Sequence, residues 1–256
     1  VALRGDRKLQ KRNMVNIDTV YQRVLALANK EQRGYLTPQE FNLHANQAQM
    51  NIFEQYFYDI HQFQSTQKGN DNSYSDMISI LEEKISLFEL YAQDLASNTS
   101  NKGKLPSDVY RLGQVQFGSS FADSVVVERV TTNEINLLLN SNLTAPTLSR
   151  PVYVRAANST TYDIELYPTT FSASNRMDNV SVNYIKKPTK CEWAYVVVNE
   201  KALFNANNAV HFELHPSEEE SLVINILELA GITINKAGLA QTAANMDQKN
   251  IQQEKQ

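Results

Sequence analysis

The segment from His211 to His215, His-Phe-Glu-Leu-His, has two imidazoles and a carboxylate at alternate positions. Alternate side chains of an extended segment lie on one face, so these three groups could meet at a metal ion. Zinc sites usually recruit further His or Cys ligands, and the other two histidines, His44 and His61, lie in predicted helices far along the chain. We therefore interpret this segment as a polar strand edge before a helix, and we predict no metal site.

Cys191 is the only cysteine of the chain, which excludes an intramolecular disulfide and is typical of assembly in a reducing compartment. It precedes an apolar run, so we expect a partly buried structural residue and not a nucleophile. The eight glycines form no phosphate-binding loop, and no G-x-S-x-G nucleophile elbow occurs. The sequence therefore predicts no catalytic residues, no cofactor-binding residues and no cofactor.

Aromatic residues gather in the middle of a long predicted helix. Stacking on nucleic-acid bases usually places Arg or Lys between such rings, and none is present here, so packing is the better interpretation. The rings go most of the way round a helical turn, so some of them should face a second subunit. Together with two apolar residues of the C-terminal tail, the candidate subunit-interface residues are Phe53, Tyr56, Phe57, Tyr58, Leu239 and Ile251.

Three amphipathic helices are predicted in the first hundred residues. Their apolar side chains recur at helical spacing, over residues 16–29, 38–63 and 75–95. Thr37, Pro38 and Glu40 form a complete helix start, in which Thr37 and Glu40 make a capping box and Pro38 occupies the first helical position. Short polar loops join the helices, and the pattern therefore predicts an antiparallel helical bundle over residues 15–97.

A β region is predicted after a polar linker at residues 98–104. Apolar and polar residues alternate at residues 152–155, 162–167 and 180–185, which predicts three strands. We also expect strands at residues 109–117, 124–130 and 193–198, with a short helix through Leu139 after the strand at 124–130. Prolines stand only at the edges of the strands at 152–155, 162–167 and 180–185, so we expect these three to form an antiparallel meander. The prediction is an antiparallel β domain, a sheet or sandwich, over residues 105–215 with Trp193 in its core.

The two ends of the chain differ in charge. Residues 1–13 hold five basic residues and one acidic residue, and we expect residues 1–14 to form a basic, disordered segment. Three glutamates after Ser217 begin a helix over residues 216–231, which should pack on the bundle and end at Gly231. The Gln-rich tail, residues 235–256, has few large apolar residues, so we expect it to dock on a neighbouring subunit.

The composition places the chain among globular α+β proteins, with an N-terminal helical bundle, a central antiparallel β region and C-terminal helices. Its 256 residues are 42% hydrophobic and 20% charged, and no apolar run approaches the roughly 18 residues of a membrane span. The net charge of −4 is the opposite of the basic surface that a tight nucleic-acid binder needs. We predict neither membrane association nor sequence-specific DNA binding.

The order of these elements, with several motifs, resembles a family of virion proteins. The motifs precede or lie within the predicted strands: Leu105-Pro-Ser-Asp-Val-Tyr-Arg-Leu112, Arg150-Pro-Val-Tyr-Val154, Ile164-Glu-Leu-Tyr-Pro168 and Val182-Asn-Tyr-Ile-Lys-Lys-Pro188. They are similar to the head-to-tail connector proteins of short-tailed bacteriophages, of the adaptor or tail tubular gatekeeper type. The helical region after Asn16 resembles virion structural proteins of marine and crAss-like phages.

The resemblance implies a non-enzymatic structural protein of the virion tail or neck, assembled in the host cytoplasm. It implies a closed ring, usually a dodecamer, with the portal protein on one side and a tail or nozzle protein on the other. Packaged double-stranded DNA would touch the ring transiently and without sequence preference. Two other hypotheses stay open, namely a β-sandwich module that binds carbohydrate or a receptor, and a hydrolase that uses His211 and His215.

Overall fold

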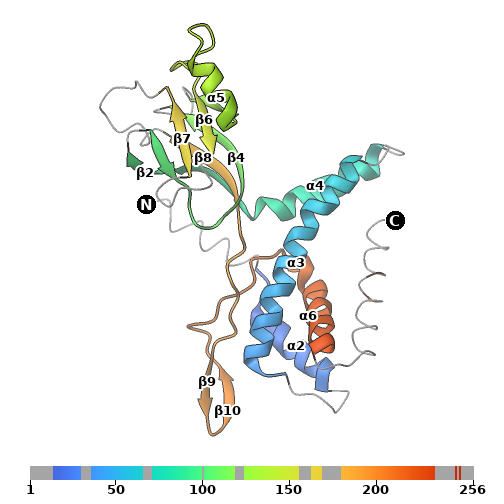
Figure 1. Cartoon of the computed structure of the whole chain (residues 1–256). Coiled ribbons are helices and arrows are strands. Elements are labelled where there is room, and N and C mark those ends of the chain that lie inside the picture. The colour runs from blue at the N-terminus through green and yellow to red at the C-terminus, as the bar shows by residue number, and fades with distance from the viewer. Residues whose placement is uncertain are drawn as a thin grey trace. The chain divides into compact units, whose positions relative to one another are not determined.

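The structure, a computed structural model, describes residues 14–29, 36–65, 71–99, 101–118, 124–155, 163–168, 180–233, 246 and 248. The chain forms two compact units. The helical unit comprises Val1–Leu87 and Pro188–Gln256, and the sheet unit comprises Phe88–Lys187 (Figure 1). The predicted α+β class is confirmed. Residues 1–13 and most of the tail at 235–256, for which we predict disorder and docking on a neighbouring subunit, lie outside the described residues.

The helical unit is built around helix α6 (Glu219–Thr233), which contacts two other helices. Its helices are α2 (Ile17–Asn29), α3 (Pro38–Ser65), α4 (Asp71–Ser86), the short 3-10 helix η4 (Pro216–Glu218) and α6 (Glu219–Thr233). Helix α6 packs against both α3 and α2, and α4 packs against α3. The prediction that the acidic C-terminal helix packs on the other helices is confirmed. However, α6 continues beyond the buried Gly231, because a helical glycine costs only about 1 kcal/mol relative to alanine.

The start of α3 follows the predicted capping box. The Thr37 N–H donates to Glu40 Oε2 at 2.9 Å, and the Glu40 N–H donates to Thr37 Oγ1 at 3.2 Å. These hydrogen bonds favour the ionised carboxylate and lower the pKa of Glu40. The prediction of this helix start is confirmed, and α3 is 28 residues long.

The third helix is shorter than predicted, and this shifts the boundary between the units. Helix α4 ends at Ser86, and Glu89–Asp94 forms strand β1 in place of the last turns of a helix. Leu90 of β1 pairs with Tyr184 across the sheet, so strand pairing overrides the helical spacing of the apolar residues. The prediction of a helix to residue 95 is therefore wrong, and the units meet at residues 88 and 187 instead of 105 and 215.

The sheet unit contains one eight-stranded sheet in the order β1-β8-β4-β5-β6-β7-β3-β2. The remaining strands are β2 (Ala96–Thr99), β3 (Lys102–Lys104), β4 (Val109–Phe117), β5 (Val125–Val130), β6 (Val152–Arg155), β7 (Ile164–Tyr167) and β8 (Val180–Lys186). The two edge strands, β1 and β2, are separated in sequence only by Leu95. The sheet must therefore curl until its edges come near each other.

The predicted meander of three strands is only partly correct. Strands β6 and β7 are antiparallel neighbours, but β8 lies between β4 and β1. Twelve residues separate Tyr167 from Val180, which is long enough for the chain to reach a distant part of the sheet. The nine-residue β4 offers β8 a longer partner than the four-residue β7 does.

Two apolar layers cover the two faces of this sheet. The inner layer draws residues from most strands: Leu95, Leu105, Val115, Val127, Tyr153, Ile164, Leu166, Val180, Val182 and Tyr184. On the other face, Ile135 of helix α5 (Thr132–Leu139) packs against Val130, Val152 and Val154. Strands β5 and β6 are parallel, so a crossover must join them, and α5 lies in that crossover.

Gly113 permits a close approach between two strands. Strand β4 departs from regular pairing between Leu112 and Val115, and a Cβ added to Gly113 would lie 2.9 Å from the backbone oxygen of Asn183. We expect Gly113→Ala to lower the free energy of unfolding by about 1–3 kcal/mol, measured by urea denaturation. The exposed Arg111→Ala on the same strand is the control and should change it by less than about 0.5 kcal/mol. Equal effects of the two variants would contradict this account of the bulge.

Candidate interaction site, an anchored apolar hairpin

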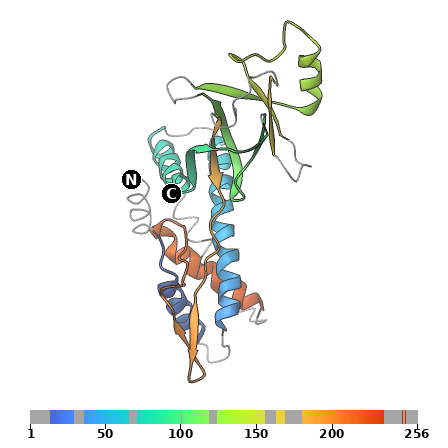
Figure 2. The same cartoon turned by 90° about the vertical axis from the view of Figure 1, so that its left-hand side faces the viewer.

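A separate two-stranded hairpin lies in the helical unit. Strand β9 (Tyr195–Val198) pairs with β10 (Lys201–Phe204), and Asn199 and Glu200 form the turn with φ values of 49° and 63°. Positive φ at both turn residues matches the twist of the flanking strands, and asparagine tolerates this conformation well. Both views show the hairpin projecting beyond the ends of α2 and α3 that lie beside it (Figures 1 and 2).

Trp193 anchors the base of the hairpin in the helical core. Its side chain is 2% exposed, and its ring stacks on those of Tyr195 and Phe204, each with a centroid separation of 5.8 Å. The indole also contacts Tyr21 of α2 at 4.1 Å, and its Nε1–H donates to Asp18 Oδ1 at 2.9 Å. Tyr195 and Phe204 are cross-strand partners, so one indole fixes both strands at the point where they leave the core.

Amide side chains of α3 hold the segment that leads into the hairpin. Asn42 accepts from the Trp193 N–H at 2.8 Å and donates to the Trp193 carbonyl at 3.3 Å. Asn46, one helical turn later, does the same for Cys191, at 3.0 and 2.9 Å. Alternate residues of an extended segment thus pair with side chains four residues apart on a helix. The helix takes the place of a neighbouring strand and satisfies backbone groups that burial would otherwise leave unpaired.

Gln49 extends this arrangement by another turn. Its Nε2 donates to the Thr189 carbonyl at 2.8 Å, and its Oε1 accepts from the Glu213 N–H at 3.2 Å. The side chain is only 2% exposed, although glutamine is normally a surface residue. Sequence reasoning missed these three amides. The signal was present in their helical spacing, at positions 42, 46 and 49, on a face that otherwise buries apolar residues.

The free end of the hairpin exposes apolar side chains. Residues that alternate along a strand, together with their cross-strand partners, lie on one face, which we call the outer face. It consists of Val196, Val198, Lys201 and Leu203, and its three apolar members are 51%, 46% and 52% exposed. The opposite face of the hairpin includes Tyr195 and Phe204, which stack on Trp193. The outer face is therefore a rigidly held apolar surface, and contact with another protein is the role that this chemistry suits.

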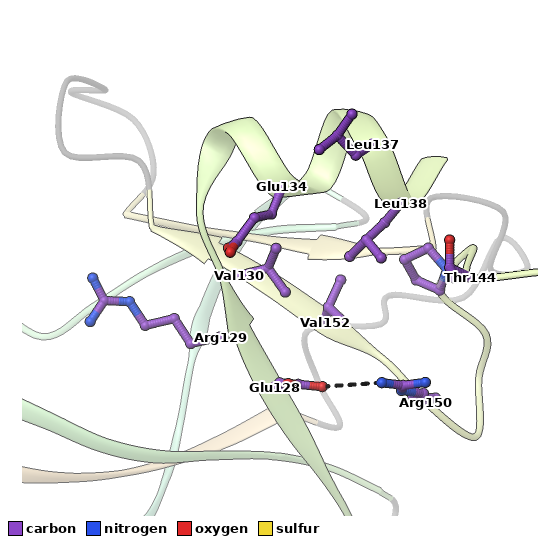
Figure 3. Close-up of a pocket in the computed structure, with 10 residues that line it drawn as sticks. Glu128, Arg129, Val130, Glu134, Leu137, Leu138, Thr144, Arg150 and Val152 are labelled. Atoms are coloured by element: carbon purple, nitrogen blue, oxygen red, sulfur yellow. Dashed lines mark ion pairs between the residues drawn. The ribbon is translucent and has the colours of Figure 1, made fainter. Parts of the chain in front are cut away.

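The sheet unit has a pocket of about 370 Å³ beneath α5. Val130, Leu138 and Val152 point toward one another and form its apolar floor (Figure 3). Leu137 also lines the pocket and is 72% exposed. Charged residues of both signs also line it, namely Glu128, Arg129, Glu134 and Arg150, and the side chain of Arg129 points away from the apolar floor (Figure 3). Glu128 and Arg150 form an ion pair at 3.8 Å between exposed side chains. The hollow thus combines an aliphatic floor with a charged edge.

The four aromatic residues predicted at a subunit interface differ in how far they are buried within their own chain. Phe53 and Tyr56 are 0% and 4% exposed within their own chain, so we correct these two from interface candidates to core residues. Phe57 is partly buried and packs edge-to-face on Phe53 at 5.1 Å, whereas Tyr58 is 66% exposed and stays a candidate. Helix α6 packs against α3, so the chain itself buries more of the apolar surface of α3 than the sequence indicated. Leu239 and Ile251 lie outside the described residues.

The three groups of the predicted polar edge each have a separate partner. His211 Nδ1 accepts from the Ile17 N–H at 3.3 Å, and His215 Nδ1 lies 2.8 Å from Ser217 Oγ at the start of η4. The Glu213 carboxylate accepts from the Thr189 N–H at 2.9 Å. No group of three or more His, Cys, Asp or Glu side chains within the described residues could hold a metal ion.

Cys191 is buried, and burial raises the pKa of its thiol to about 12. We expect no reaction with a thiol reagent at pH 8 until the chain is unfolded, measured by absorbance with Ellman's reagent. Above its ordinary pKa of about 8.5, the thiol loses its proton only in the unfolded chain, so this contribution to stability falls as pH rises toward 12. Rapid labelling of the folded protein at pH 8 would contradict the burial of this thiol.

The chain matches no known protein family, and no curated protein shows significant similarity to it. The resemblance to phage connector proteins therefore stays a prediction that depends on the motifs of this chain. No helix in the described part of the chain has both the length and the apolar character needed to cross a membrane.

Proposed function

We propose that the chain is a non-enzymatic structural protein of a short-tailed bacteriophage virion. In this proposal it assembles into a closed ring that joins the portal to the tail and lines or closes the DNA exit channel. The observation that supports it best is the hairpin. Its base is locked by Trp193 and the amides of α3, while its free end exposes Val196, Val198 and Leu203.

An exposed, rigid, apolar hairpin suits assembly better than catalysis. Apolar side chains such as those of valine and leucine favour a contact that removes them from water. Among the described residues, neither edge of the hairpin pairs with a further strand, so both edges could add to such a contact. Holding the hairpin in one conformation reduces the entropy lost on binding. These features favour repeated contact between identical or matching subunits.

The alternative of a carbohydrate-binding module has less support. Sugars usually bind where aromatic rings and polar groups meet in a concave site. The residues that line the pocket beneath α5 are aliphatic, charged or small, and none of them has an aromatic ring. The sheet unit also forms one curled sheet and not two stacked sheets.

Mass measurement tests the proposed function directly. The purified full chain is analysed by light scattering after size exclusion and by negative-stain electron microscopy, alone and mixed with the portal protein of the same virus. We expect rings, with twelve copies visible in end-on views, in at least one of the two conditions. A monomer that stays a monomer in both, or one that binds glycans on an array, would overturn the proposal.

A further inference from the structure

Two of the apolar surfaces in the described part of the chain differ in form and lie on different units. One is the outer face of the hairpin, a ridge on the helical unit, and the other is the pocket beneath α5, a hollow in the sheet unit. We propose that the hairpin of one copy seats in the α5 pocket of the neighbouring copy. The inference rests on the proposed ring function, and it names the contact that joins the subunits.

The apolar groups of the two features match in kind and scale. Val196 and Leu203 are cross-strand partners, so the outer face presents two branched aliphatic side chains side by side. The pocket floor consists of similar groups, Val130, Leu138 and Val152, and its volume of about 370 Å³ is that of a site for a few side chains.

The charges of the two features are also complementary. Glu200 and Lys201 stand next to each other at the hairpin turn, where both are exposed. Glu128 and Arg150, which also line the pocket, offer a partner of opposite sign to each turn residue. Paired charges around an apolar contact set its orientation and disfavour wrong partners. A second copy of this chain therefore offers both an apolar surface and charged partners to the hairpin.

The contact joins different surfaces of the two copies, so it is heterologous. Each copy keeps a free hairpin and a free pocket after one contact forms, and a closed ring satisfies all of them. Face-to-face pairing of two hairpins would instead be isologous, would stop at a dimer and would leave the pocket uncovered. The two arrangements thus predict different products.

Matched lysine substitutions test which surfaces take part. We expect Val196→Lys on the outer face and Leu137→Lys in the pocket lining each to reduce the ring fraction by about tenfold or more. The controls are Val197→Lys, on the opposite face of the same strand, and Leu139→Lys, which is on α5 but does not line the pocket. These controls should assemble like the unsubstituted chain, and circular dichroism checks that all four variants are folded. Equal effects of test and control variants would overturn the proposal.

Cross-linking identifies the partner surfaces. Leu203→Cys copies and Leu137→Cys copies are assembled separately and as a mixture, then treated with a short bis-maleimide, while the buried Cys191 stays unreactive. We expect covalent dimers in the mixture only. Dimers of Leu203→Cys alone, or intact rings without any cross-link, would overturn the hairpin–pocket contact but leave the ring function standing. Absence of rings from the unsubstituted chain would overturn the proposed function itself, before the hairpin–pocket contact is tested.

Discussion

Lys84→Met is expected to lower the free energy of unfolding of the helical unit by about 3–5 kcal/mol. Lys84 Nζ lies 2.6 Å from Glu218 Oε1, and the two side chains are only 12% and 8% exposed. A carboxylate left without its partner at this depth must either stay desolvated or take up a proton, and both are unfavourable. The chain has one tryptophan, Trp193, and it lies in the helical unit, so fluorescence during urea denaturation measures this unit alone.

The position of this pair explains the size of the effect. Lys84 is in the last turn of α4, Glu218 is in η4, and the ammonium group also lies 5.7 Å from the ring centre of Tyr56 on α3. Three elements that are distant in sequence therefore meet at one pair of charges. Loss of the lysine weakens the attachment of α4 as well as the start of α6.

A double variant distinguishes the loss of one charge from the loss of the whole Lys84–Glu218 ion pair. Lys84→Met with Glu218→Leu removes both charges and is expected to recover most of the lost stability, because apolar residues of similar size often replace a buried ion pair at little cost. The exposed Arg23→Met, which removes the pair with Glu219, is the control and should change the stability by less than about 1 kcal/mol. An equally small effect of Lys84→Met would show that water reaches the Lys84–Glu218 pair.

Local signals in the sequence predicted many of the elements. The capping box at Thr37 and Glu40 requires only residues within one turn, and strand β4 was predicted at its observed bounds, residues 109–117. The error at residues 87–95 has a different origin. Phe88 and Leu95 have helical spacing, but the partner that makes residues 89–94 a strand is β8, about ninety residues further along the chain. No local pattern contains that partner.

The candidate interaction site was the least predictable part. The prediction of a strand within residues 193–198 is confirmed, but Trp193 lies in the core of the helical unit and not in that of the β domain, so that part of the prediction is wrong. An apolar run also normally indicates burial, whereas Val196–Val198 are exposed. The exposure of Val196–Val198 depends on which other elements pack against the hairpin. The periodicity of the sequence does not reveal that packing. The helical unit is also assembled from two segments separated by the whole sheet unit, so composition along the chain could not mark its boundary.

Trp193→Ala is expected to lower the free energy of unfolding by about 3–5 kcal/mol and to release the hairpin from the core. The substitution removes a fully buried indole that stacks on Tyr195 and Phe204 and leaves Asp18 without its donor. Far-ultraviolet circular dichroism replaces fluorescence as the probe of urea denaturation, because this variant has no tryptophan. Hydrogen exchange of the hairpin amides, measured by mass spectrometry, should become faster while that of the sheet unit stays unchanged.

Trp193→Phe distinguishes the two roles of the indole. Phenylalanine keeps an aromatic ring between Tyr195 and Phe204 but cannot donate to Asp18, so a smaller loss of about 1–2 kcal/mol is expected, with most hairpin protection retained. Protection that survives in Trp193→Ala would mean that the hairpin holds its own conformation. If the anchor matters as argued, Trp193→Ala should also impair ring assembly although every residue of the outer face is intact. The anchoring of the hairpin by Trp193 can then be distinguished from the contact that its outer face makes. Val196→Lys is expected to impair assembly without any change in hydrogen exchange.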